Sequence, residues 1–198
     1  MSGSVESGRP TPTRTRWKSG PPRSRFNDFS PLWPASPHNV GFRVAEALAE
    51  RWDLPKPRKK FGGELSEGRT GPGGPRVAVL RPQTYMNDSG RSVGPARGAF
   101  KLDLDRLVVI HDEIDLPFGE VRARLGGGLA GHNGLKSLRR ELGAPDFYRV
   151  RVGVGRPDST DPDIVAAYVL GKWRQPAAEV EALVERAADE AESLVLAG

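Results

Sequence analysis

The chain has 198 residues, with 30 Lys and Arg, 25 Asp and Glu, three His and no Cys. This length is typical of one domain, or of one domain with a tail. The absence of Cys excludes disulfide frameworks and Cys-ligated metal sites. The longest strongly aliphatic run, Leu107–Ile110, is far shorter than the roughly 20 residues of a membrane helix, so we expect no membrane partner. No apolar stretch follows the N-terminal basic residues, which predicts a cytoplasmic protein without a secretory signal.

The charge is distributed unevenly along the chain. Residues 1–35 carry six bases and two acids, whereas residues 176–198 carry one base and six acids, and the residues between them are basic on balance. A basic surface is one signature of a polyanionic partner such as nucleic acid. Ordinary solubility explains the same balance, so the charge alone leaves both interpretations open.

The first 37 residues differ in composition from the rest of the chain. Residues 1–37 are rich in Ser, Gly, Pro, Thr and Arg and show no apolar periodicity, and Pro31, Pro34 and Pro37 disfavour a helix. We therefore expect this segment to be disordered. The folded domain is predicted over residues 38–198.

Helices and strands alternate along the predicted domain. Val44, Leu48 and Trp52 recur at helical spacing and predict a helix over 40–53. The continuous apolar run Leu107–Ile110 predicts a strand buried on both faces. The other predicted elements are a loop or hairpin over 56–75, strands over 76–81, 121–125 and 148–154, and helices over about 87–100, 133–142, 161–170 and 177–196. This alternation predicts an α/β fold, a single domain with a mixed twisted sheet flanked by helices.

Polar clusters stand at the ends of these elements, where open α/β sheets place their sites. His38 directly precedes the first helix, where the positive partial charge of the helix favours the neutral imidazole that a general base needs. A capping or surface role fits the same position. His111 and Asp112 are expected just past the end of the buried strand, where Asp112 could orient a base or bind a metal. Carboxylates at strand ends also cap helices and form turns.

A glycine-rich segment, Gly126–Gly134, contains the spacing G-x-G-x-x-G between a predicted strand and a predicted helix. This is the pattern of dinucleotide-binding proteins. The preceding strand carries Arg122 and Arg124, however, and no acidic residue follows where that fold requires one. The segment also suits an anion or a developing oxyanion, because glycines let backbone N–H groups approach it. Asn87 offers amide donors and an acceptor for a water and a carbonyl, or a helix cap.

Several long segments resemble those of bacterial peptidyl-tRNA hydrolases. They are Leu80–Gly90, Val109–Gly119, Gly126–Lys136 and Arg149–Pro157, and His38–Phe42 is similar to the catalytic-histidine segment of that family. The resemblance covers about residues 38–190. It implies a monomeric α/β esterase that cleaves the bond between a peptide and the terminal ribose of tRNA and needs no metal, cofactor or covalent nucleophile.

The resemblance also implies roles for individual residues. His38 would be the general base that activates water, and Asp112 would hold and polarise its imidazole. Asn87 and Asn133 would place the substrate and the water. The other implied sites are a pocket wall at Tyr85 and Met86, a peptide channel from Gly128 to Gly131, and tRNA phosphate contacts at Arg122, Arg124, Arg149 and Arg151.

The chain departs from the family at its beginning. The family starts with a buried strand that ends in a Gly-x-x-Asn-Pro-Gly turn, whereas Phe29–Pro37, directly before His38, contains neither. We therefore expect the first strand to be missing or replaced, and residues 1–37 to be an aberrant segment such as a shifted reading frame. Pro95 is a second departure and is expected to kink the helix that contains it.

Two further functions remain open from the sequence. A catalytically impaired, RNA-binding member of the same family would share the motifs but would not cleave the ester. A dinucleotide-binding oxidoreductase rests on the glycine spacing alone. Release of an N-blocked aminoacyl group from tRNA separates the enzyme from both alternatives.

Overall fold

The computed structural model describes residues 36–129 and 131–198, which belong to the unit Pro34–Gly198. The interpretation of residues 1–37 as disordered or aberrant falls mostly on residues 1–35 and so lies outside the described residues. Ser36 and Pro37 are described, and both are buried. No helix in the described ranges is long and apolar enough to cross a membrane.

One of two three-stranded sheets is antiparallel throughout. It consists of β1 (Arg58–Lys60), β2 (Gly63–Arg69) and β3 (Arg76–Pro82) in that order. The turn between β1 and β2 uses positive φ at Phe61 and Gly62, as a tight hairpin turn requires. The side chains of β1 are exposed, so this sheet ends at a solvated edge.

The second sheet is mixed and positions the functional residues. It consists of β4 (Val108–Glu113), β6 (Tyr148–Gly153) and β5 (Val121–Leu125) in that order, with β4 parallel and β5 antiparallel to the central β6. Side chains alternate between its two faces, as a strand dictates. Val150 and Val152 are fully buried in the larger apolar core, and Arg149 and Arg151 point to the opposite face.

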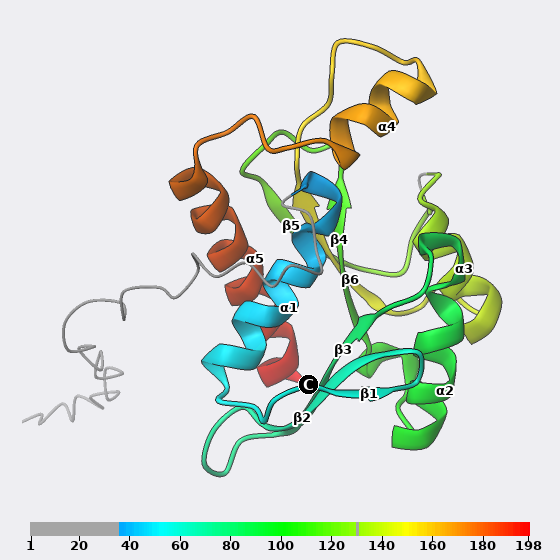
Figure 1. Ribbon diagram of the computed structural model, residues 1–198. Coiled ribbons are helices and arrows are strands. Elements are labelled where there is room, and N and C mark those ends of the chain that lie inside the picture. The colour runs from blue at the N-terminus through cyan, green and yellow to red at the C-terminus, as the bar shows by residue number, and fades with distance from the viewer. Residues whose placement is uncertain (1–35, 130) are drawn as a thin grey trace, which may run out of the picture. The chain divides into compact units, whose positions relative to one another are not determined.

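Helices cover both faces of the mixed sheet (Figure 1). The helices α1 (Val40–Arg51) and α5 (Ala177–Ala197) lie side by side and pack with β6 in the larger core. The helices α2 (Gly90–Phe100) and α3 (Asn133–Leu142) pack on each other, and α3 covers a smaller core with Phe147 and Val109. The remaining helical elements are α4 (Pro162–Leu170) and the 3-10 turns η1 (Pro37–Asn39), η2 (Met86–Asp88) and η3 (Leu104–Arg106).

The structure confirms the α/β class and nearly all predicted elements, with two corrections. The expectation that His111 and Asp112 lie past the strand is wrong, because β4 continues to pair with β6 through Glu113. The expected single sheet is two three-stranded sheets in the described residues, with β3 at the end of one and β4 at the end of the other. Pro95 lies inside α2.

Candidate active site

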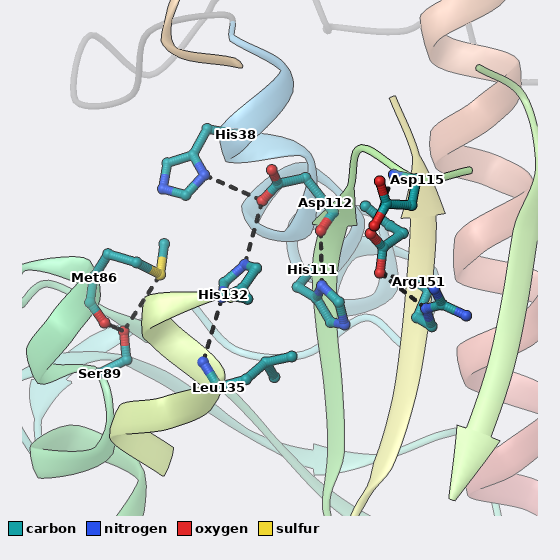
Figure 2. Close-up of polar contacts among 10 residues, drawn as sticks. His38, Met86, Ser89, His111, Asp112, Asp115, His132, Leu135 and Arg151 are labelled. Carbon is teal, nitrogen blue, oxygen red and sulfur yellow. Dashed lines mark hydrogen bonds and ion pairs between the residues drawn. The ribbon is translucent and has the colours of Figure 1, made fainter. Parts of the chain in front are cut away.

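The C-terminal end of β4 carries a carboxylate, that of Asp112, which the imidazole rings of His38 and His132 approach (Figure 2). Asp112 lies on β4 and is 7% exposed. His38, on η1, places its Nδ1 3.1 Å from Asp112 Oδ1, and the two residues are 74 positions apart in the sequence. The turn η1 and the helix α1 that follows it both contact β4. The approach is close at Gly41 of α1, where an added Cβ would be 2.5 Å from the backbone oxygen of Ile110.

The charge states within this pair follow from its contacts. Burial alone would raise the pKa of Asp112, but His132 and His38 outweigh burial and hold the pKa of the carboxyl well below its ordinary value. Asp112 is therefore ionised and accepts a hydrogen bond from His38 Nδ1–H. The hydrogen bond to Asp112 in turn raises the pKa of His38 above 6.5, although burial opposes it. In the neutral imidazole the lone pair consequently lies on Nε2, and the His38 side chain is 22% exposed.

A third histidine, His111, completes the polar cluster from the other face of β4. Its Nδ1 lies 2.7 Å from the backbone oxygen of Asp112. Burial first, and then His132, lower the pKa of His111 to about 4, so the ring is neutral at neutral pH. Glu113, the next residue on β4, accepts hydrogen bonds from Arg151 at 3.0 Å.

The segment before α2 lies beside the N-terminal end of α3. A Cβ on Gly134 would be 2.5 Å from Met86 Sδ, so a glycine is needed for Met86 to pack there. Tyr85 is 84% exposed, and the side chains of Asn87 and Asn133 also reach solvent. The structure thus brings Met86 next to α3, while Tyr85, Asn87 and Asn133 remain free to meet a ligand.

The glycine-rich segment and the four predicted arginines form a second region of the same sheet. Gly128 accepts a hydrogen bond from Arg149 at 2.7 Å, and Gly126, Gly127 and Gly131 have positive φ. Arg122 pairs with Glu120 at 2.6 Å, and the exposed Arg124 lies under Gly127. Arg149 is only 3% exposed, so it has almost no surface on which a phosphate could bind directly.

The contact between His38 and Asp112 suits proton transfer. In the described ranges no group of three or more His, Cys, Asp and Glu is placed to hold a metal ion. An ionised carboxylate that holds the Nδ1–H of an imidazole leaves a basic nitrogen on the other side of the ring, which is the arrangement of a general base.

Sequence reasoning missed His132. It caps α3, and its Nε2 lies 3.7 Å from Asp112 Oδ1. The one available signal was its place directly before the predicted helix at 133, which indicates a cap but not the nearby carboxylate.

Known proteins of one family resemble this chain throughout the folded region. A family model described as peptidyl-tRNA hydrolase matches residues 31–198. A peptidyl-tRNA hydrolase of Anaeromyxobacter dehalogenans is 49% identical over 77% of this chain and 78% of its own. One of Mycolicibacterium smegmatis is 45% identical over 85% and 87%. The crystal structure of peptidyl-tRNA hydrolase from Acinetobacter baumannii superposes with a TM-score of 0.73 at 33% identity, over 83% of each chain.

Proposed function

Since the chain belongs to the peptidyl-tRNA hydrolase family, we propose that it hydrolyses the ester between a peptide, or an N-blocked amino acid, and the terminal ribose of tRNA. The reaction would recycle tRNA from prematurely released peptidyl-tRNA. We place it in the cytoplasm and expect the chain to act as a monomer. The observation that carries the proposal is the 3.1 Å contact between His38 Nδ1 and Asp112 Oδ1.

The reaction uses His38 as the general base. Its Nε2 takes a proton from a water molecule as the water oxygen bonds to the ester carbonyl carbon. Asp112 stabilises the imidazolium that forms, through the Nδ1–H bond that is already in place. The bond between the carbonyl carbon and the ribose oxygen then breaks, and the imidazolium returns the proton to that ribose oxygen. A positioned base of this kind contributes about 10²–10⁴-fold to the rate.

The neighbouring residues would bind the two halves of the substrate. We assign Tyr85 and Met86 to the terminal adenosine and the first amino acid, and Asn87 and Asn133 to the water and the ester carbonyl. Gly128 to Gly131 would line the path of the peptide. For the tRNA phosphates we retain the accessible Arg122 and Arg124, with Arg151 once its pairing with Glu113 rearranges. The burial of Arg149 supports an indirect role for it, in holding Gly128.

The test is the release of a labelled N-acetyl amino acid from tRNA by the purified full chain. We expect multiple turnover by the unchanged chain, and no release above background by His38→Ala purified in the same way, which also controls for a contaminating hydrolase. Binding of tRNA by His38→Ala should be nearly unchanged. Binding without release by the unchanged chain would refute the proposal and favour the RNA-binding alternative.

A further inference from the structure

His132 is held in one orientation and one tautomer. It is the N-cap of α3, where its Nδ1 accepts a hydrogen bond from the backbone N–H of Leu135 at 3.3 Å. A nitrogen that accepts a hydrogen bond carries the lone pair, so in the neutral ring the proton lies on Nε2. The ring also packs edge-on against His111, with centroids 4.9 Å apart. The direction of the Nε2–H bond is therefore fixed by the backbone of α3.

This Nε2–H points at the carboxylate that His38 uses (Figure 2). Nε2 is buried and has no hydrogen-bond partner among the described residues. The carboxylate oxygen it approaches, at 3.7 Å, is Asp112 Oδ1, the same atom that lies 3.1 Å from His38 Nδ1. A buried donor without a partner costs free energy, and hydrogen bonds within active sites are often long in the free enzyme and tighten when substrate binds.

We propose that His132 is a positioning residue for the hydrolysis proposed above, and that its Nε2–H shares Asp112 Oδ1 with His38 and so limits how strongly the carboxylate holds the His38 ring. This inference rests on the roles proposed for His38 and Asp112. A second donor on the same oxygen takes part of its acceptor capacity. His38 is thereby oriented by Asp112 without being held so firmly in its protonated form that it fails as a base at neutral pH.

The other polar and charged groups around Asp112 have partners or surroundings of their own. Burial keeps the pKa of His111 at about 4. Glu113 is bound to Arg151. On α4, which contacts η1, Tyr168 donates to the backbone oxygen of Val154. On α1, Arg43 interacts with Glu181 and Glu46 rather than with the cluster.

Two substitutions separate the contact with Asp112 from the helix cap. His132→Asn keeps a short side-chain acceptor that caps α3 but has no donor at the Nε2 position. His132→Gln places an amide NH2 near the former Nε2 but loses the cap. If sharing of the carboxylate matters, removal of the donor strengthens the hold of Asp112 on His38 and raises the pKa of His38. His132→Asn should show this rise and His132→Gln should not.

The readout is an NMR titration of the ring protons of His38 in the full chain, which contains only three histidines. We expect the His38 midpoint to move upward by about half a pH unit in His132→Asn and to stay near that of the unchanged chain in His132→Gln. In the hydrolysis assay the acid limb of kcat/KM should move with it, by about threefold in rate on that limb.

Three results would overturn the inference: no shift in either variant, an equal shift in both, or a shift confined to His132→Gln, the last of which would indicate the cap alone. The titration needs no turnover. If the unchanged chain fails to release the amino acid, the proposed function fails, and the sharing of Asp112 is still decided by the titration.

Discussion

Two regions on the same mixed sheet are organised in opposite ways. At the end of β4, His38 and His132 approach one buried carboxylate, that of Asp112, and His111 contacts the backbone oxygen of the same residue. Along β5, Arg122 and Arg124 stand on the surface, and Arg122 pairs with the half-exposed Glu120. In the first region hydrogen bonds fix the positions of individual side-chain atoms, whereas the second region exposes positive charge to solvent.

This difference matches the two proposed tasks, which are catalysis at the end of β4 and tRNA binding along β5. A buried carboxylate and imidazole work through one hydrogen bond, so the loss of one atom changes the reaction by orders of magnitude. Exposed arginines act through long-range attraction that water and salt screen, so each of them contributes modestly and nearly additively. Substitutions at the end of β4 should therefore change the reaction strongly, and substitutions along β5 should change tRNA binding modestly.

The largest effect is expected from Asp112→Asn. The Asn amide presents either an NH2 or an oxygen to His38 and carries no charge, so it no longer holds the productive tautomer or stabilises the imidazolium. We predict a loss of about 10³–10⁴-fold in kcat, measured by release of N-acetyl amino acid from tRNA. Glu113→Gln is the matched control, because it neutralises an equally buried carboxylate one residue further along β4. Equal losses in both variants would contradict the role of Asp112.

The support beneath the histidines depends on a close approach of α1 to β4. A Cβ on Gly41 would be 2.5 Å from the backbone oxygen of Ile110, whereas one on Gly98 of α2 would meet no atom within 4 Å. We predict that Gly41→Ala lowers the free energy of unfolding by about 1–3 kcal/mol, and that Gly98→Ala raises it by about 0.5–1 kcal/mol. Urea denaturation measures both. Equal effects would show that α1 does not dock as described.

The pH dependence of the reaction should report the raised pKa of His38. The imidazole must be unprotonated to act as a base, and the hydrogen bond to Asp112 favours the protonated form. Activity therefore rises as the pH increases through this pKa, and the acid midpoint of kcat/KM lies above the ordinary value of 6.5. A midpoint clearly below 6.5 would show that burial, rather than the hydrogen bond to Asp112, determines the pKa of His38.

The smallest effect per residue is expected on the arginine surface. The double variant Arg122→Ala, Arg124→Ala should leave kcat at saturating substrate unchanged. It should reduce the slope of log Kd for tRNA against log salt by about two. Filter binding over a salt series measures this slope. Arg186→Ala, an exposed arginine on the acidic helix α5, is the control and should keep the slope. An unchanged slope in the double variant would show that Arg122 and Arg124 do not contact the tRNA phosphates.

Local pattern was enough to predict most elements but not their assembly. Residues 133–142 form a helix as expected, because apolar spacing and the glycines around it are local signals. β2 was predicted only as part of a loop or hairpin, since Gly63, Ser66 and Gly68 weaken its strand pattern. β4 is longer than its apolar run, because pairing with β6 carries His111 through Glu113 into the sheet.

In the site, too, the features that depend on tertiary packing could not be predicted from local sequence. Spacing alone could not join His38 to Asp112 across 74 residues, and the family resemblance suggested that pair before the structure placed it at 3.1 Å. The burial of Arg149 could not be foreseen from the alternation of β6, because the face it occupies is covered by the glycine-rich segment, whose Gly128 it binds. The proximity of His132 to Asp112 could not be predicted either, because it depends on how α3 packs near β4.

Chemical rescue tests the central claim most directly. His38→Gly removes the proposed base and leaves space where an added imidazole could act on the same water. We predict that His38→Gly releases no N-acetyl amino acid from tRNA until imidazole is added, and that the rate then follows the concentration of unprotonated imidazole. Full activity of His38→Gly without imidazole would contradict the claim that His38 is the base.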